Sequence, residues 1–305
     1  MKKNLFSKFI ALATVFTLGM TIVGCGTETK SDKKETKTES TQEKERTAEE
    51  KKVVLGTVAI AEIFNKLGYK NVVGVPETDY DLGAYKDVKK IGKPMTPDAE
   101  VVKSVNPDIF FSEKSLQEAN EKKLGALNIN SKFLDLGSYD GIINSIKEIG
   151  NELNIKDSTD KLVEEIESRS EAAFKKTEGK TSKKVLYLFG TPKSILVGTS
   201  SSYIGSLLKK MNINNVAGDN EKSYIPLSME NIIAENPDVI LVMNHVDPQT
   251  SKMMVEKAFS ENPALKNINA VKNDKVVFLD NKIFSVTGNI HVADAIEELV
   301  KVAYE

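Results

Sequence analysis

A stretch that occurs twice in the chain constrains its fold more than any other feature. The first copy, residues 100–111, reads EVVKSVNPDIFF, and the second, residues 230–242, reads ENIIAENPDVILV. Two further echoes keep the same order: NVVG at 71–74 with NVAG at 215–218, and KFLDL at 132–136 with VVFLD at 276–280. A single Asn-Pro-Asp turn can recur by chance between a helix and a strand. Several echoes in one order indicate two related lobes.

The alternation of short apolar runs with helical patterns predicts the fold class. Between residues 52 and 305, apolar runs are bounded by turn residues and followed by stretches with helical spacing. We therefore expect an α/β fold of two related lobes, each a mainly parallel sheet flanked by helices. In the first lobe the expected strands are 52–58, 71–75, 108–112 and 132–136, and the expected helices are 59–67 and 116–127.

One long helix is predicted between the lobes. Residues 158–178 read STDKLVEEIESRSEAAFKKTE, with apolar residues at helical spacing and charges on the other face. Such a helix spans roughly 30 Å, enough to cross a small domain. A flexible linker would be rich in Gly and Ser, so this connection is expected to be rigid. The predicted division is an N-terminal lobe at 52–156, a backbone helix at 157–180 and a C-terminal lobe at 181–305.

The first 51 residues are expected to lie outside the folded lobes. Residues 1–25 begin with lysines, continue as an apolar run and end in IVGC, the pattern of a lipoprotein signal peptide. Cys25 is the only cysteine in the chain, so we expect it to carry a lipid after cleavage. An ordinary signal peptide with an incidental cysteine is the alternative. Residues 26–51 are mostly Thr, Ser, Lys and Glu and are expected to form a disordered tether.

These features place the protein outside the cytoplasm, at the cell membrane, anchored through Cys25.

The net charge of −2 argues against a nucleic-acid partner, which would favour a basic chain. The two histidines exclude a metal site built from a cluster of imidazoles. The chain contains no nucleophile elbow, HExxH, P-loop or GxGxxG motif, so we do not expect an enzyme.

Met95 stands in an unusual position for a methionine. It lies in the segment GKPMTP at 92–97, where two prolines stiffen the backbone on either side of it. Thr96 is expected to cap a helix that starts at Pro97 and runs to Val105. The loop would thus present a thioether just before a helix start. Taken alone, Met95 is equally explained by packing within the loop.

His245 directly follows the apolar run VILVMN at 239–244. Open α/β sheets bind their ligands at the carboxyl ends of their strands, and this residue is expected at such an end. A lone histidine after a strand is more often a surface residue, so its position is only suggestive. His291, at the start of the last expected helix, is its rival.

Four motifs carry a resemblance to a known family. They are YKDVKKIGKPMTPDAE at 85–100, SYIGSLLK at 202–209, SYIPLSMENII at 223–233 and ENPDVILVMNH at 235–245. With the tether and the long helix, they make the chain resemble the helical-backbone (class III) substrate-binding proteins of ABC importers, which carry haem, cobalamin and ferric siderophores. Within that group the chain is most similar to the haem receptors of the iron-regulated surface determinant systems of Gram-positive bacteria.

The resemblance implies a haem site between the lobes. Haem b would be the transported ligand, with Met95 and His245 in the positions of the axial ligands of its iron. One thioether and one imidazole form a stable axial pair for haem iron. His291 matches no ligand position in the family.

The resemblance also implies contacts around the macrocycle and with other proteins. Backbone N–H groups at the turn Thr57-Val58-Ala59 would receive the propionates. Further contacts by hydrogen bonding or stacking are expected from Tyr80, Tyr203 and Tyr224. Permease docking is expected from Glu100 and Glu230, one in each lobe. The implied partners are haem, an ABC permease and its ATPase, surface haem-relay proteins and the membrane that holds the lipid anchor, and the protein is expected to be a monomer.

The alternative is a binding protein for a ferric siderophore or cobalamin on the same frame. Such pockets use arginine or tryptophan for anionic or ring-shaped ligands. This chain has no tryptophan, and its arginines, Arg46 and Arg169, fall in the tether and in the long helix. The composition therefore favours haem.

Overall fold

The computed structural model describes residues 50–191, 194–244 and 248–305. The described residues belong to one compact unit. Cys25, most of the expected tether and His245 lie outside the described residues, so the predictions made for them stay predictions. Within the described ranges, no helix combines the length and the apolar character needed to span a lipid bilayer.

The first lobe is built on a four-stranded sheet in which every pair of neighbours is parallel. Its strand order is β2-β1-β5-β6. The strands are β1 (Val53–Leu55), β2 (Val72–Gly74), β5 (Ile109–Glu113) and β6 (Ser131–Leu134). The helices of this lobe are α1 (Val58–Leu67), α2 (Ala99–Ser104) and α3 (Gln117–Leu124). Each expected strand and helix is therefore present, with ends shifted by a few residues.

The second lobe has a larger, mixed sheet of order β10-β8-β7-β11-β12, with β9 also paired to β7. Strands β9, β11 and β12 run parallel to their neighbours, whereas β8 and β10 are antiparallel. The strands are β7 (Lys184–Gly190), β8 (Ile195–Gly198), β9 (Asn214–Asn215), β10 (Tyr224–Pro226), β11 (Val239–Asn244) and β12 (Val276–Phe278). The helices are α6 (Tyr203–Lys210), α7 (Met229–Glu235), α8 (Pro248–Glu261) and α9 (Asn269–Lys272).

The same local structure closes the Asn-Pro-Asp turn in both lobes. The Asp108 carboxylate accepts a hydrogen bond from the backbone N–H of Lys52 at 2.7 Å, and Asp238 does the same for Lys184 at 3.0 Å. The preceding asparagines both adopt left-handed backbone, with φ of 46° at Asn106 and 45° at Asn236. Because β2-β1-β5-β6 corresponds strand for strand to β9-β7-β11-β12, the prediction of two related lobes is confirmed.

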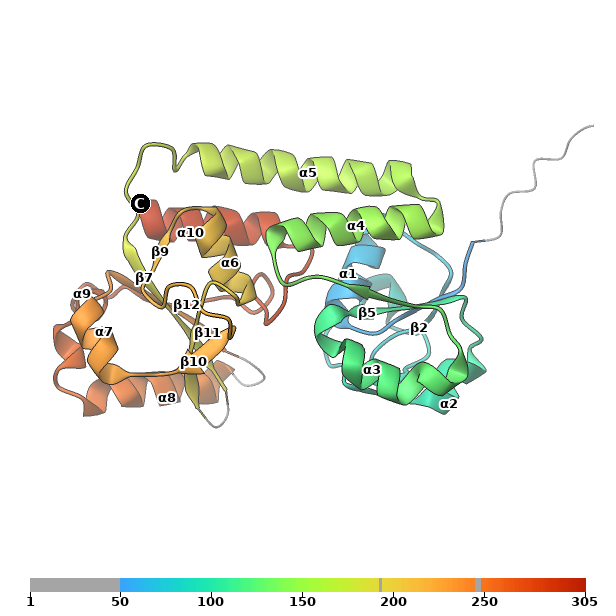
Figure 1. Cartoon of the computed structure of the whole chain (residues 1–305), viewed down its shortest axis with the longest axis horizontal. Helices are drawn as coiled ribbons and strands as arrows, with labels where there is room; N and C mark the ends of the chain where they lie inside the picture. The colour runs from blue at the N-terminus through green and yellow to red at the C-terminus, as the bar shows by residue number, and fades with distance from the viewer. Residues whose placement is uncertain (1–49, 192–193, 245–247) are drawn as a thin grey trace, which may run out of the picture. The chain divides into compact units, whose positions relative to one another are not determined.

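Three helices form a layer of their own (Figure 1): α4 (Tyr139–Leu153), α5 (Lys156–Lys175) and α10 (Val292–Tyr304), with α5 packed against the other two. Helix α5 buries Leu162, Val163 and Ile166 on one face. It starts two residues before the expected segment and ends three residues before its end, and it is the long helix that the charge pattern predicted. The largest hydrophobic core is continuous and includes side chains from both sheets as well as from these helices.

The prediction that Thr96 caps a helix starting at Pro97 is wrong. Thr96–Pro97 form a short strand, β4, paired antiparallel with β3 (Gly92–Lys93). The cap of α2 is Asp98, whose carboxylate accepts hydrogen bonds from the N–H groups of Glu100 and Val101, and the helix ends at Ser104. The two potential caps stand two residues apart, and the first, Thr96, pairs with Lys93 in the hairpin, in which Gly92 adopts a φ of 91° that glycine tolerates.

Candidate ligand-binding site

Met95 lies at the tip of the β3–β4 hairpin, and 64% of its surface is exposed. The side chain of Asn120, which is completely buried, holds the hairpin in place by hydrogen bonds. The Asn120 amide donates to the carbonyl of Pro94 at 2.9 Å and accepts from the Ser112 hydroxyl at 2.6 Å. A large apolar side chain is thus held outward on a rigid support. Such a thioether is available to a ligand.

The first strand-to-helix turn lies at the carboxyl edge of the same sheet. Thr57 caps α1, because its hydroxyl accepts a hydrogen bond from the N–H of Ile60 at 3.4 Å. The first N–H groups of a helix have no partner inside the helix, and the helix dipole makes this end positive. Thr57, Val58 and Ala59 therefore lie at the start of α1, which begins one residue before the expected helix, and this end suits an anionic group. Whether it meets a propionate stays a prediction.

Glu113, which the sequence did not single out, is buried beside this turn. It is the last residue of β5, and only 7% of it is exposed. Its carboxyl accepts a hydrogen bond from the Ser115 hydroxyl at 3.4 Å, and the hydroxyls of Thr57 and Thr287 also favour its ionised form. Burial raises the pKa of this carboxyl, and the three hydroxyls oppose that rise only in part. Among the residues that the structure describes, no cation pairs with this carboxyl, which is uncommon for a buried acid.

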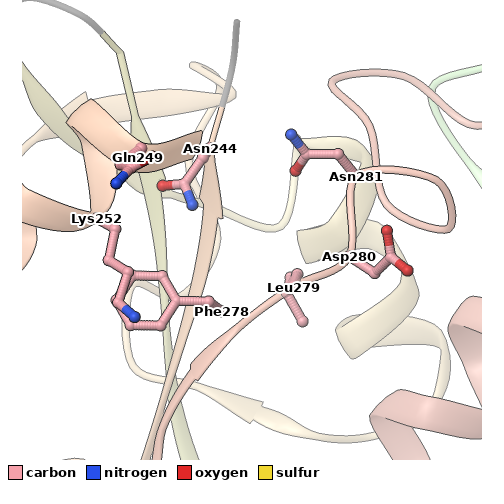
Figure 2. Close-up of a pocket in the computed structure, with 7 residues that line it drawn as sticks. All are labelled: Asn244, Gln249, Lys252, Phe278, Leu279, Asp280 and Asn281. Atoms are coloured by element: carbon pink, nitrogen blue, oxygen red, sulfur yellow. The ribbon is translucent and has the colours of Figure 1, made fainter. Parts of the chain in front are cut away.

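The carboxyl edge of the second sheet carries a pocket of about 480 Å³. Figure 2 shows its walls, which come from the end of β11, the first turns of α8 and the segment after β12. Its lining residues are Asn244, Gln249, Lys252, Phe278, Leu279, Asp280 and Asn281. Asn244 is 4% exposed, and its side-chain oxygen has no hydrogen-bond partner among the described residues. In the sequence, Asn244 is followed by His245, the predicted iron ligand.

The three tyrosines differ in what they can offer a ligand. Tyr80 is 59% exposed, and Tyr224 is half-buried with its ring stacked on Phe189 at 4.5 Å between centroids. Tyr203 is only 2% exposed and packs closely against Gly288. Tyr80 and Tyr224 therefore present surface, whereas Tyr203 belongs to the core and has little surface to present. A ligand contact by any of them stays a prediction.

The two glutamates predicted to dock on the permease occupy equivalent places. Glu100 and Glu230 are exposed and lie in the first turns of α2 and α7, just after the caps Asp98 and Ser228. A carboxylate there is favoured by the helix dipole, so local structure also accounts for them. Their docking role stays a prediction.

His291 lies in a network of charged side chains at the start of α10. Its Nδ1 atom is 3.0 Å from the Asp294 carboxylate, which also binds Arg169 of α5 at 2.5 Å. Arg169 binds Glu297 as well. These pairs hold α10 against α5 and give His291 a structural role. In the part of the chain that the structure describes, no three His, Cys, Asp or Glu side chains are arranged to hold a metal ion.

Comparison with known proteins places the chain among solute receptors. Residues 53–283 match the family model described as periplasmic binding protein. Over 256 residues the chain is 34% identical to the high-affinity heme uptake system protein IsdE of Staphylococcus aureus (strain Newman), covering 83% of this chain and 87% of that protein.

Solved structures agree with this placement. An ABC transporter substrate-binding protein from Listeria monocytogenes EGD-e is 33% identical with a TM-score of 0.77, covering 84% of this chain and 99% of the other. The structure of S. aureus IsdE complexed with heme is 34% identical with a TM-score of 0.76, covering 84% of this chain and 100% of the other.

Proposed function

Because the chain belongs to the periplasmic binding protein family, as a substrate-binding protein of ABC transport rather than an enzyme, we propose that it captures haem outside the cytoplasm. Haem b is the ligand, and an ABC permease with its ATPase takes it up for its iron. Surface haem-relay proteins supply it, and a lipid on Cys25 holds the monomeric receptor at the membrane.

The observation that carries the proposal is the exposed methionine on a fastened hairpin. Met95 is 64% exposed, so its apolar side chain contributes little stabilisation by burial. The fully buried amide of Asn120 nevertheless hydrogen-bonds Pro94, the residue before Met95, and fixes its position. Binding of haem iron by the Met95 thioether would account for both the exposed side chain and its fixed position. The S. aureus relative at 34% identity is a heme uptake protein, which supports the same ligand.

The proposed binding mode uses residues of both lobes. We assign Met95 of the first lobe and His245 of the second to the two axial positions of the iron. The turn Thr57-Val58-Ala59 receives the propionates on its N–H groups, and Tyr80 and Tyr224 border the macrocycle. With both axial positions filled, the iron has no open position for oxygen chemistry, which suits a carrier.

An absorbance titration with ferric haem tests the ligand and its two axial residues together. The unchanged chain should bind one equivalent and give a low-spin spectrum. Met95→Ala and His245→Ala should each alter that spectrum, because each removes one axial ligand. Met253→Ala is the matched control, since Met253 is also exposed, at 57%, but lies on α8.

The same titration separates the rival assignments. If the spectrum survives both substitutions, the axial assignment fails. A loss on His291→Ala instead would move the second ligand to the start of α10. Failure to bind haem at all would leave the ferric siderophore or cobalamin alternative, which titrations with those ligands then test.

Docking and anchoring have separate tests. Glu100→Ala and Glu230→Ala should keep the haem spectrum but lower haem-dependent ATP hydrolysis by the permease complex, because charge pairs at an interface set registry and partner choice. Unchanged hydrolysis would remove the docking role.

Cys25→Ala should release the protein from the membrane, whereas a membrane-bound variant would contradict lipid attachment at this residue.

A further inference from the structure

Glu113 is buried at the carboxyl edge of the first sheet, where a ligand of this family would bind. It ends β5, pairs in register with Leu134 of β6 and is 7% exposed. Its partners are the Thr57 hydroxyl from the turn before α1, the Thr287 hydroxyl from the segment between β12 and α10, and Ser115 at 3.4 Å. One carboxyl thus touches three separate parts of the chain.

All of these partners are uncharged. Moving an ionised carboxylate out of water is costly unless a cation compensates it. Near it, Lys114 and Asp135 are exposed and pair with each other at 3.8 Å, and Lys132 of β6 pairs with Glu152 at 2.9 Å. On α1 the first ionisable residue is Glu62, and after the Thr287 segment it is His291. Burial accordingly raises the pKa of Glu113, so this group changes its charge closer to neutral pH than an exposed glutamate does.

Thr57 connects this carboxyl to the anion-binding turn. Its hydroxyl accepts from the N–H of Ile60 and also interacts with the Glu113 carboxyl, and because β1 pairs in register with β5, Glu113 lies beside the start of α1. The positive end of that helix favours an anion, and an ionised Glu113 in the same place opposes it. A ligand carboxylate bound at this turn and an ionised Glu113 carboxylate therefore repel each other.

We propose that Glu113 couples ligand binding to proton uptake, so that the receptor binds its carboxylate-bearing ligand more tightly when this side chain is protonated. The inference rests on the proposed function, in which the ligand is haem and its propionates meet the Thr57 turn. Glu113 then acts as a positioning residue: protonated, it leaves the turn free for the ligand anion, and ionised, it repels that anion.

The sign of the effect follows from linkage. A bound propionate makes it harder to ionise Glu113, so binding takes up a proton wherever Glu113 is ionised in the free protein. Affinity must then fall as the pH rises through the titration of Glu113. Comparing the unchanged chain with a Glu113 variant isolates this effect, because every other titrating group is common to both.

The first test compares haem affinity at several pH values between about 5.5 and 8.5 for the unchanged chain and Glu113→Gln. Glutamine keeps the shape and cannot ionise. We expect the affinity of the unchanged chain, divided by that of the variant, to fall about tenfold across this range. Glu118→Gln is the matched control, because Glu118 is exposed on the neighbouring helix α3, and its ratio should stay flat.

The second test needs no variant. Calorimetry of haem binding in two buffers with different ionisation enthalpies counts the protons taken up, and haem dimethyl ester, which lacks the carboxylates, is the comparison ligand. We expect proton uptake with haem and less with the ester. Equal proton uptake with both ligands, or a flat ratio in the first test, would overturn the role of Glu113 while leaving haem binding intact. A chain that binds neither haem nor its ester would instead overturn the proposed function.

Discussion

Asn120 is completely buried, and both ends of its amide are occupied: it accepts from Ser112 and donates to the carbonyl of Pro94. The side chain therefore transmits the position of β5 to the tip of the hairpin that carries Met95. A single buried amide thus connects the core of the first lobe with the predicted iron ligand.

Asn120→Ala should lower the free energy of unfolding by about 1–3 kcal/mol, because Ser112 and Pro94 each lose a buried partner. It should also weaken the haem spectrum, since Met95 loses its fixed position. Chemical denaturation and the haem titration measure the two effects. Asn151→Ala, an exposed asparagine on α4, serves as control and should change neither. A destabilised variant with an unaltered haem spectrum would show that the hairpin holds its position without Asn120.

The two Asn-Pro-Asp turns allow a second prediction at single residues. Asn106 is exposed with a φ of 46°, so Asn106→Ala should cost about 1 kcal/mol through backbone strain, while Asn106→Gly should cost less. Asn236 has the same backbone, but its side-chain oxygen also accepts from the N–H of Asn269 at 2.8 Å. Glycine should therefore substitute less well at 236 than at 106. Equal effects of glycine at the two sites in thermal unfolding would contradict this account.

At the scale of elements, sequence patterns predicted what depends on local chemistry. The strands of the first lobe, the long helix and the duplicated turn follow from apolar periodicity and from Asn and Pro at fixed places. The cap of α2 did not, because Thr96 and Asp98 are both good caps and only the β3–β4 pairing decides between them. The antiparallel strands β8 and β10 are absent from the first lobe, so the duplication could not predict them.

The same distinction applies to the candidate site: residues placed by local sequence patterns could be predicted, and residues buried by remote segments could not. The turn at Thr57 could be located because a strand and a helix flank it in the sequence. Glu113 could not, because FSEK reads as the polar end of a strand, and what buries its carboxyl includes Thr287, which is remote in the sequence. Similarly, nothing near Tyr203 in the sequence shows that it packs on Gly288. Burial by remote segments is the information that local patterns lack.

Glu152 connects the end of α4 with the first sheet through ion pairs, and these pairs make a pH-dependent contribution to the free energy of unfolding. It binds Lys132 of β6 at 2.9 Å and Lys51, just before β1, at 3.0 Å. Hydrogen bonds from Lys132 and then Lys51 lower the pKa of Glu152. Because the folded pKa is the lower one, the contribution is complete above the ordinary glutamate value of about 4.3 and is lost as the pH falls through the folded pKa.

Between neutral pH and about pH 3, the unchanged chain should therefore lose more unfolding free energy than Glu152→Gln does, by about 0.5–1 kcal/mol. Urea denaturation at a series of pH values measures this difference. Glu164→Gln on α5 is the control, since Glu164 is exposed and should behave like the unchanged chain. Parallel curves for the unchanged chain and Glu152→Gln would show that these ion pairs contribute nothing to folding.

For the whole molecule, the continuous core is the feature that decides behaviour. Residues of both sheets share one hydrophobic cluster with α4, α5 and α10, while smaller clusters serve only one lobe each. Arg169 of α5 adds ion pairs to Asp294 and Glu297 of α10. Two lobes that contribute to one continuous hydrophobic cluster cannot unfold separately without exposing part of that cluster to water.

We therefore predict that both lobes unfold in one transition. The chain contains no tryptophan, so one introduced tryptophan reports on one lobe alone. Phe133→Trp on β6 and Phe278→Trp on β12 replace half-buried rings in the first and second sheets and should keep the fold. Their fluorescence transitions in denaturant should coincide with each other and with the loss of helical circular dichroism, which is the test of two-state behaviour. If the two tryptophans report different midpoints, the shared core does not couple the lobes, and each would have to be treated as a separate folding unit.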